Sequence, residues 1–450
     1  MNNESTSSSI VNVIIWLFLL MSIFLLIYIY YRSEIVYQGF KSVIYFKYYI
    51  ISILGVIFWG FALKLSKSVK EKIVLLVASI LASLYLVEAI MSIGFIKKYS
   101  RIIAAHEQGI EFDSRSKLQV IDDYRDIGVN AVAHVIPRDF IDPASSLNTV
   151  PITPFSGISN RMTVFCNENG EYATFVSDRY GFNNLDALWD SEKVEWLLIG
   201  DSFTEGACVD PDKNIAGQIQ SKTGESVINL GYSGNGPLIE LATLKEYGEI
   251  KKPKKVIWLY LEENDLTENL PYEKESSFLL NYLQPGFTQN LIHKQKLIND
   301  SLSKYILSRE NERRSVRSFM FLSNLRTFIK FDYQIDKIFK IDPLFAEILM
   351  EARDRVNAQG GQLYFVYLPE FSRYSSSNVD HGNYKKRNEV ISIVQDLKIP
   401  VIDIHQNSFI NHKDILSMFA LRMNGHYSAY GYKEVANTII QQVKKYENNK

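Results

Sequence analysis

Four short polar segments in the carboxyl-terminal half of the sequence carry side chains suited to acyl transfer. The first, residues 200–206, places Ser202 directly after an apolar run. A serine hydroxyl becomes a nucleophile when a base removes its proton, and backbone N–H groups at a sharp turn can stabilise the resulting oxyanion. Serine and aspartate are also favoured helix caps, so this segment alone favours neither interpretation.

A histidine and two further segments supply what a serine nucleophile needs. His426, just ahead of the last helical segment, is the candidate base. Residues 229–237 contain three glycines, Gly234 among them, which let the backbone approach a substrate closely, although a plain turn would also explain them. Asn264 can donate a side-chain N–H, and the acidic residues beside it are assigned to solvation or helix capping.

Alternating strands and helices from Glu195 onward must position these segments. The predicted strands are 196–199, 227–230, 256–261, 363–368 and 400–404, and the predicted helices lie near 215–221, 237–247, 343–358, 387–397 and 430–446. Short, nearly continuous apolar strands predict a parallel sheet covered on both faces. Ligands bind at the carboxyl ends of such strands, so the four polar segments should meet there.

The order and placement of these segments resemble the SGNH (GDSL-type) hydrolase superfamily from about residue 191 onward. The resemblance implies a flavodoxin-like α/β/α sandwich with a five-stranded parallel sheet. It also implies Ser202 as nucleophile and His426 as base. The N–H groups of Ser202 and Gly234 would form an oxyanion hole with the Asn264 side chain, and no cofactor is expected.

Two positions depart from the family pattern. Glu262 replaces a glycine and adds a side chain at the pocket wall, which puts the substrate scope in doubt. The carboxylate that orients the histidine is missing, because Met423 and Asn424 occupy its usual positions. Asn424 could orient His426 as a neutral acceptor, and Asp403 is a second candidate that could equally be a strand-end cap. The working hypothesis is a Ser–His dyad.

Three apolar runs in residues 1–98 predict a membrane anchor. They cover 10–31, about 43–65 and 73–96, and each is long enough to cross a hydrocarbon core of about 30 Å. The lysines between the second and third runs favour a cytoplasmic loop, whereas basic residues in the first loop and after the third run favour the opposite orientation. Charge alone leaves the orientation undecided, and we expect the soluble part to be extracytoplasmic.

The remaining chain divides into an extension, residues 99–190, and the domain 191–450. The extension shows short strands and loops without a strong helical period. Residues of about 270–340 form a helical, basic insertion in the second part. A solvated helix face explains such a run better than contact with a membrane surface or an acidic substrate.

Composition argues against several other functions. The 450 residues carry 49 basic and 50 acidic side chains, which leaves no positive excess for nucleic acid. Cys166 and Cys208 cannot build a disulfide framework and lack zinc-site spacing, so metal and redox chemistry are not expected. Cys208 is interpreted as a small buried hydrophobe. The histidines other than His426 are interpreted as surface or satisfied core residues.

The sequence therefore predicts a multi-pass membrane protein that works as a serine esterase or O-acyltransferase. The resemblance implies an acylated, probably acetylated, cell-envelope glycan as substrate, whereas the anchor itself suggests lipid esters. A membrane acyl-donor protein is a candidate partner besides the lipid bilayer. The alternative hypothesis is a glycan-binding or assembly component that has lost efficient catalysis. It is motivated by the missing aspartate and by Glu262 at the glycine position.

Overall fold

The structure is a computed structural model. It describes residues 2–37, 39, 42–92, 95–141, 152–313, 317–320, 322, 325, 326, 329, 340–375 and 383–449. Contacts divide the chain into two units. The first contains the described residues up to Lys97 and those between 311 and 337, and the second contains the rest.

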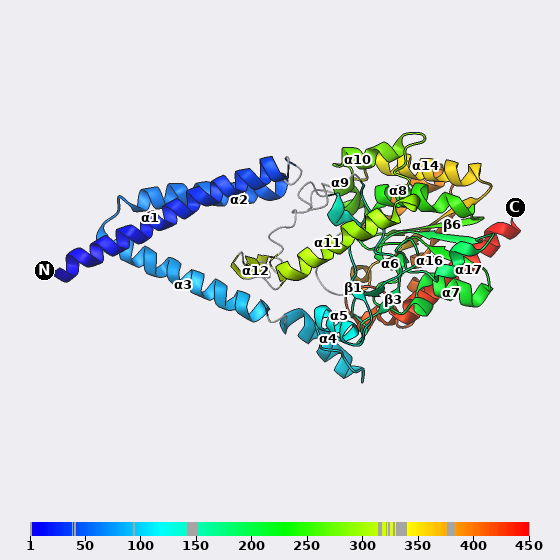
Figure 1. Cartoon of the computed structure of the whole chain (residues 1–450), viewed down its shortest axis with the longest axis horizontal. Helices are drawn as coiled ribbons and strands as arrows, with labels where there is room; N and C mark the ends of the chain where they lie inside the picture. The colour runs from blue at the N-terminus through cyan, green and yellow to red at the C-terminus, as the bar shows by residue number, and fades with distance from the viewer. Residues whose placement is uncertain are drawn as a thin grey trace. The chain divides into compact units, whose positions relative to one another are not determined.

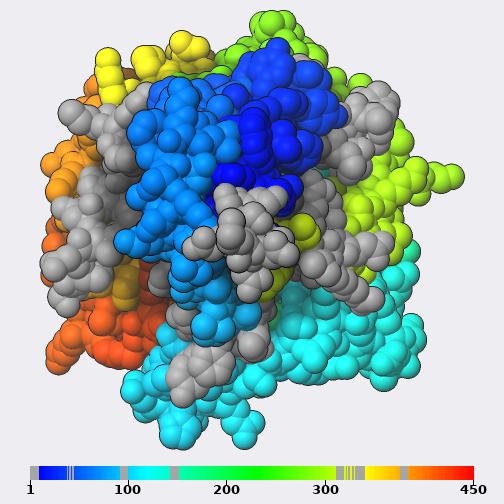
Figure 2. All heavy atoms as spheres, turned by 90° about the vertical axis from the view of Figure 1, so that its left-hand side faces the viewer, coloured from blue at the N-terminus to red at the C-terminus, as the bar shows by residue number. Residues whose placement is uncertain are grey.

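The first unit is built on three long apolar helices. These are α1 (Asn2–Tyr30), which continues as a π-helix over Tyr31–Val36, α2 (Ser42–Ala62) and α3 (Lys67–Ser92). All three are long and apolar enough to cross a membrane. Many of their large apolar side chains are exposed, and Figure 2 shows this outer surface in blue.

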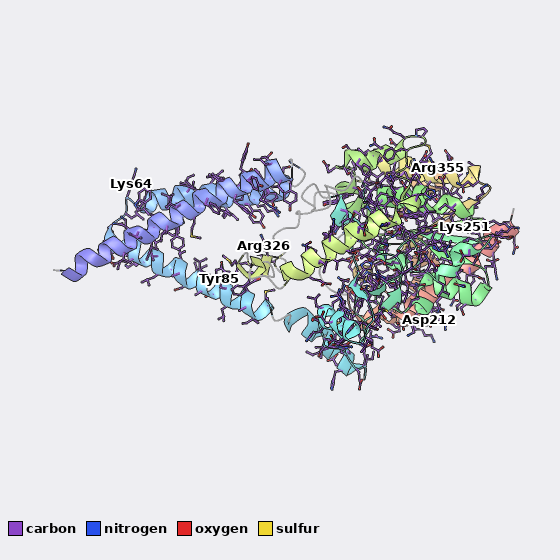
Figure 3. The ribbon with its side chains drawn as sticks, in the orientation of Figure 1. Lys64, Tyr85, Asp212, Lys251, Arg326 and Arg355 are labelled. Carbon is purple, nitrogen blue, oxygen red and sulfur yellow. A yellow bond between two sulfur atoms is a disulfide. The ribbon has the colours of Figure 1, made fainter. Side chains whose placement is uncertain are left out.

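Polar contacts in this unit involve the few ionisable side chains of the helices. Lys70 donates to the side chain of Asn12 at 2.9 Å. Glu88 accepts the backbone N–H of Leu325 at 2.8 Å, and the neighbouring Arg326, labelled in Figure 3, donates to the hydroxyl of Tyr48 at 3.0 Å. Part of the basic insertion therefore packs on the apolar helices. Other parts of it, including Arg314 and Lys330, lie outside the described residues.

The second unit contains the predicted five-stranded parallel sheet. Its strands are β4 (Trp196–Ile199), β5 (Val227–Asn229), β6 (Lys255–Leu261), β7 (Gln362–Leu368) and β8 (Val401–Asp403). Their order across the sheet is β5-β4-β6-β7-β8, and every neighbouring pair is parallel. Because β4 lies between β5 and β6, the loops that follow these three strands meet at one edge.

Successive residues of the strands belong to two different buried clusters, as the two faces of a pleated sheet require. Leu197 and Ile199 pack in the cluster that also contains side chains of α8 (Pro237–Tyr247), α14 (Leu344–Ala358) and α15 (Arg387–Asp396). Trp196 and Leu198 pack in the cluster that contains α7 (Ile215–Thr223) and α17 (Ala429–Asn448). Figure 1 shows these helices around the sheet.

Residues before the sheet form a smaller structure of their own. The helices α4 (Phe95–Glu107) and α5 (Lys117–Asp126) precede a three-stranded sheet of β1 (Ala131–Ala133), β2 (Met162–Val164) and β3 (Thr174–Val176). β1 and β2 are parallel, and β2 and β3 are antiparallel. Short strands were expected here, but α5 was missed because only Val120 and Ile121 of its ten residues are buried.

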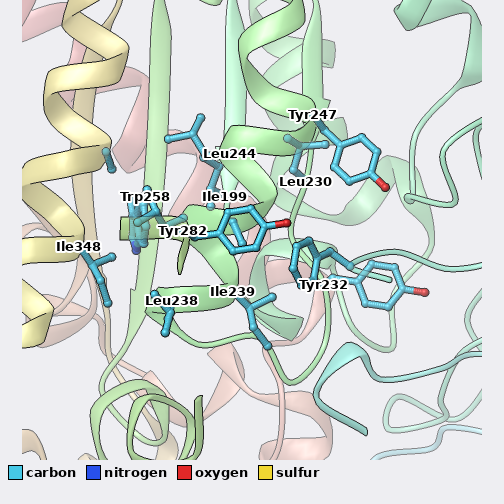
Figure 4. Packing of buried hydrophobic residues seen from close by; sticks show 14 of the residues in the cluster. Ile199, Leu230, Tyr232, Leu238, Ile239, Leu244, Tyr247, Trp258, Tyr282 and Ile348 are labelled. Atoms are coloured by element: carbon cyan, nitrogen blue, oxygen red, sulfur yellow. The ribbon is translucent and has the colours of Figure 1, made fainter. Parts of the chain in front are cut away.

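Helices also occupy the segment between β6 and β7. They are α9 (Leu270–Glu273), α10 (Ser277–Leu280), α11 (Gln295–Arg313) and α12 (Arg317–Met320). Tyr282, which follows α10, is buried with Leu238 and Ile239 of α8 in the cluster drawn in Figure 4. The same cluster contains Tyr232 from the loop after β5, so this loop rests on the core.

Leu259→Ala should destabilise the second unit strongly. Leu259 lies on the central strand β6 with 0% of its surface exposed, and large-to-small changes in cores cost about 2–5 kcal/mol. We expect a clearly lower temperature of thermal unfolding. Leu185→Ala is the matched control, because Leu185 is 69% exposed and the same change should cost less than about 0.5 kcal/mol. Equal effects of the two changes would contradict the placement of β6 in the core.

Candidate active site

Ser202 is the first residue of a short helix at the carboxyl end of β4. This helix, α6 (Ser202–Glu205), begins directly after Asp201, whose carboxylate accepts the amide of Phe203 at 2.9 Å. Asp201 is therefore the helix cap. The capping role that the sequence left open for Ser202 belongs to its neighbour, and the serine hydroxyl has a different partner.

That partner is the imidazole of His426. Nε2 of His426 lies 2.9 Å from Oγ of Ser202, although 224 positions separate the two residues along the chain. His426 lies in the loop before α17, whose first turn Ser428 caps by accepting the amide of Gly431 at 3.1 Å. The structure thus brings together the two side chains that the sequence singled out as nucleophile and base.

A carboxylate from the extension lies on the other side of the imidazole. Oε2 of Glu168 is 3.2 Å from Nδ1 of His426 and accepts the backbone N–H of the same residue at 2.8 Å. The other carboxylate oxygen pairs with Arg101 of α4 at 3.4 Å. A proton on Nδ1 that faces a carboxylate leaves the Nε2 lone pair directed at the serine. The arrangement is therefore a Ser–His–Glu triad rather than the dyad expected from the sequence.

The two candidates for orienting His426 have other roles. The backbone carbonyl of Asn424 accepts from Arg101 at 3.0 Å. Asp403 caps α16 (Ile404–Asn407) and pairs with Arg387. Among the described residues, no hydrogen bond joins either side chain to His426. Asp403 is thus the strand-end cap that the sequence allowed, and a residue far upstream takes the orienting position.

Charge pairing changes the pKa values at the imidazole. Burial alone would lower the pKa of His426, but the charge and hydrogen bond of Glu168 outweigh it, with smaller contributions from Asp201 and Glu263, so the pKa is raised. Burial would raise the pKa of Glu168, but the charge and hydrogen bond of His426 and the charge of Arg101 lower it to about 2. Glu168 therefore stays ionised throughout the range in which His426 titrates.

Gly234 and Asn264 lie in the loops that follow β5 and β6, the two strands that flank β4. Gly234 has φ of +79°, and an added Cβ would lie 2.5 Å from Cγ2 of Ile136, so a side chain has no room there. Burial raises the pKa of Asp201 to about 6, against the lowering effects of the Phe203 amide, of the charge on His426 and of a hydrogen bond from Asn264.

A second chain of polar side chains fixes the loop that carries Gly234. Oε2 of Glu205 accepts both the backbone N–H and the hydroxyl of Ser233 at 2.7 Å. Oε1 of Glu205 lies 2.7 Å from Nε2 of His134, which stacks between the rings of Phe165 and Tyr232. Glu205 is fully buried, so its carboxylate depends on these partners. One residue of α6 thus ties the nucleophile helix to the loop after β5.

The two cysteines form a disulfide that joins the extension to the loop after α6. Cys166 and Cys208 are 42 positions apart and are bonded to each other. Asn169 also donates to the backbone carbonyl of Cys208 at 2.9 Å. The expectation that Cys208 is a plain hydrophobe without redox chemistry was wrong. The bond holds the segment of Glu168 next to the segment of Ser202.

Glu262 does not project as an unpaired side chain. It is buried, and its carboxylate accepts from Tyr367 at 2.5 Å, from the amide of Glu370 at 2.8 Å and from Arg373. The extra side chain at the glycine position of the family motif is therefore part of a buried hydrogen-bond network beside the strand end.

Sequence reasoning missed the residues of the extension that contact the site. Glu168 lies in a polar turn with no strand or helical pattern that would single it out. His134 was interpreted as a surface or core histidine. Its side chain is only 4% exposed, but its partner Glu205 also binds Ser233 in the loop of Gly234. The one available signal was the pair of cysteines, since a bond between them would have brought residue 168 close to residue 202.

Comparisons with known proteins were made with the sequence and with the structure. No family model matches the sequence, and no curated protein sequence does either. Similar solved structures include the lipase/acylhydrolase from Enterococcus faecalis, at 15% identity and a TM-score of 0.33, covering 56% of this chain and 96% of that one. Another is an acetyl xylan esterase, AlAXEase, at 13% identity and a TM-score of 0.32. That match covers 56% of this chain and 100% of the esterase chain.

A member of the lipolytic protein G-D-S-L family from Veillonella parvula DSM 2008 is similar at 12% identity and a TM-score of 0.30. The match covers 55% of this chain and 97% of that one. At these scores the activity of this chain is inferred from its own side chains and not from its neighbours.

Glu205→Gln should loosen the loop that carries Gly234. Glutamine keeps the shape of the side chain, but only one of its two terminal atoms can accept a hydrogen bond. Hydrogen bonds to a charged group are worth about 1.5–3 kcal/mol. We expect the amides of Ser233 and Gly234 to exchange their hydrogens about ten- to a hundredfold faster. Asp186→Asn is the control, because it removes an exposed acceptor of Arg179 elsewhere in the extension. Unchanged exchange in Glu205→Gln would show that other contacts hold the loop.

Proposed function

We propose that the chain is a membrane-anchored serine enzyme that cleaves or transfers acyl esters. The observation that carries this proposal is the array of Ser202, His426 and Glu168, with 2.9 Å between hydroxyl and Nε2 and 3.2 Å between Nδ1 and carboxylate. The serine hydroxyl is within hydrogen-bond distance of the imidazole, and the imidazole is within hydrogen-bond distance of the carboxylate. This is the arrangement that activates a serine. We assign the sheet and its helices to the flavodoxin-like α/β/α sandwich of the SGNH superfamily.

The reaction begins when Nε2 of His426 takes the proton of Ser202 as Oγ attacks the ester carbonyl. The imidazolium that forms is stabilised by the ionised Glu168 at Nδ1. The oxyanion is stabilised by the N–H groups of Ser202 and Gly234 and by the side chain of Asn264. His426 then gives its proton to the leaving alcohol, and the acyl group remains on the serine.

A second acceptor completes the cycle by the same proton transfers in reverse. His426 takes a proton from water or from a sugar hydroxyl, which attacks the acyl-serine, and then returns a proton to Oγ of Ser202. Water as the acceptor gives an esterase, and a hydroxyl gives an O-acyltransferase. The protein needs no other group for either outcome, so the choice depends on which acceptor the site admits.

The proposed setting is the outer side of a membrane. Disulfides persist in oxidising compartments, so the bond between Cys166 and Cys208 favours an extracytoplasmic second unit. A lysine-rich loop between α2 and α3 agrees with this orientation, because basic loops tend to remain in the cytoplasm. An acetylated glycan of the cell envelope is the proposed substrate class, as the resemblance to the SGNH superfamily implies. Esters of membrane lipids are the alternative substrate.

A binding component without catalysis is the second candidate function. It was motivated by the missing aspartate and by Glu262, and the structure weakens both reasons. Glu168 supplies a carboxylate at Nδ1, and the carboxylate of Glu262 is held by Tyr367 and Arg373. The enzyme is therefore the better supported of the two.

Ser202→Ala should abolish turnover of a small acetyl ester and labelling by a fluorophosphonate probe. The change removes the attacking oxygen, and loss of such a nucleophile lowers kcat by about 10⁶. Ser303→Ala is the control, because its exposed hydroxyl contacts only a backbone carbonyl of α11. The assignment would be refuted by normal turnover in purified Ser202→Ala, whereas polysaccharide binding without labelling of the wild type would support the binding component.

Glu168→Gln should lower kcat and move the acid limb of the pH profile. The neutral form of His426 is the base, and Glu168 raises the pKa of its ring. In the wild type the acid limb should therefore lie at a pH above the usual pKa of histidine. Without the charge the pKa falls, and the limb shifts to lower pH while kcat drops by about 10²–10⁴. Glu171→Gln is the control, because Glu171 is an exposed carboxylate three positions away. This change should alter neither kcat nor the acid limb of the pH profile. A limb that stays in place in Glu168→Gln would remove Glu168 from the mechanism.

A further inference from the structure

Cys208, Glu168 and His426 form a cluster with the composition of a metal site. One ligand atom from each, namely Sγ, a carboxylate oxygen and a ring nitrogen, lies within 4.8 Å of the other two. In the described part of the chain this is the one group of three or more such ligands that meets this distance. The cluster overlaps the acid–base end of the triad, but Cys208 takes no part in the mechanism.

The disulfide is what keeps this cluster from acting as a metal site. A sulfur bonded to Cys166 has no thiolate charge to offer. Reduction breaks the S–S bond and leaves two thiols. A dithiol supplies the two electrons and two protons and becomes a disulfide, whereas a phosphine becomes its oxide with oxygen from water, which supplies the protons. Thiolate, imidazole and carboxylate are together the ligands that zinc prefers, and the Cys208 thiol would lose its proton to solvent on binding.

The segments that carry the three ligands are also held by contacts other than the S–S bond. Asn169 holds the carbonyl of Cys208 at 2.9 Å, and Tyr432 holds that of the preceding Ala207 at 3.3 Å. Arg101 holds both the side chain and the backbone carbonyl of Glu168, and the amide of His426 donates to the same carboxylate. These contacts do not involve sulfur, so reduction should leave the cluster largely assembled.

The distances suit a small cation. Ligand atoms at about 2.0–2.3 Å from a tetrahedral zinc are roughly 3.5 Å apart, so the present cluster needs a closure of roughly 1 Å. The side chains of His426 and Glu168 are 24% and 18% exposed, which gives an ion a way in from solvent. Three protein ligands leave a fourth position for water.

We propose that the reduced protein binds one zinc ion between Cys208, Glu168 and His426, and that this ion stops the reaction. The inference that zinc stops the reaction rests on the proposed function. A cation on Nε2 would occupy the lone pair that takes the serine proton. A cation on Nδ1 would displace its proton to Nε2 and remove the contact with Glu168. In both cases Ser202 loses its base.

Two single-cysteine variants of the full-length protein in detergent micelles test the site. Cys166→Ser and Cys208→Ser both remove the disulfide, but only Cys166→Ser leaves a thiol beside Glu168 and His426. Titration calorimetry with zinc sulfate should give one site in Cys166→Ser without any reductant. Loss of a residue that only hydrogen-bonds to a metal ligand lowers metal affinity by about 10- to 100-fold. Cys208→Ser, which loses a ligand, should therefore bind zinc at least about tenfold more weakly than Cys166→Ser.

Cobalt and turnover give two further readouts. Co²⁺ bound to Cys166→Ser should show a thiolate-to-metal absorption band that is absent from Cys208→Ser. Zinc should suppress ester turnover by Cys166→Ser, EDTA should restore it, and Cys208→Ser should be at least about tenfold less sensitive. Wild type treated with a phosphine should behave as Cys166→Ser does, which covers the case in which that variant folds poorly.

Equal zinc affinity of the two variants would overturn the site, and so would the absence of the cobalt band from Cys166→Ser. Zinc bound to Cys166→Ser with unchanged turnover would overturn the block. Calorimetry and the cobalt spectrum do not depend on catalysis. They therefore decide on the metal site even if Ser202→Ala shows that the proposed function is wrong, and a negative metal result leaves the esterase proposal untouched.

Discussion

The pairing of the Glu168 carboxylate with the imidazole of His426 is the interaction on which the rest of the site depends. A partly buried histidine that must gain a proton during a reaction is costly to charge unless an anion faces it. Glu168 supplies that anion, and Arg101 keeps the anion ionised and in place. Ser202 then contacts a ring whose tautomer and orientation are both set.

The residues before the sheet are therefore part of the site rather than an accessory. They reach it at two points. Glu168 contacts the base directly, and His134 acts through Glu205 on the loop that carries Gly234. The disulfide between Cys166 and Cys208 fixes the first point covalently. Both the proton-transfer side and the proposed oxyanion side of Ser202 thus depend on the same small sheet and its loops.

The sequence was sufficient for the central sheet and for the ends of its strands. Runs such as 256–261 are apolar over their whole length because both faces of the strand are covered, and this pattern is local. Because the strands are parallel, their carboxyl ends share an edge, which is why the sequence predicts that Ser202, Gly234 and Asn264 lie at the same edge. The three apolar helices are equally local features, and helices of the expected length are present.

The partner of the imidazole could not be predicted in this way. Glu168 and His426 are 258 positions apart, and the polar turn around residue 168 has no periodic pattern. The candidates for orienting His426 that the sequence offered were the amide of Asn424, two positions away, and the carboxylate of Asp403. The same limit applied to the cysteines, because their pairing depends on two loops that only the tertiary structure brings together.

The order of the three groups along the chain has a practical consequence. The acid precedes the nucleophile, and the base comes last, so the segment from residue 191 onward encodes the sheet, Ser202 and His426 but not the counter-charge. A truncated protein that begins at the first strand of this sheet would retain the recognisable motifs and lack the electrostatic support of its histidine. Domain boundaries drawn from motif positions alone would therefore divide the proposed reaction centre between two fragments.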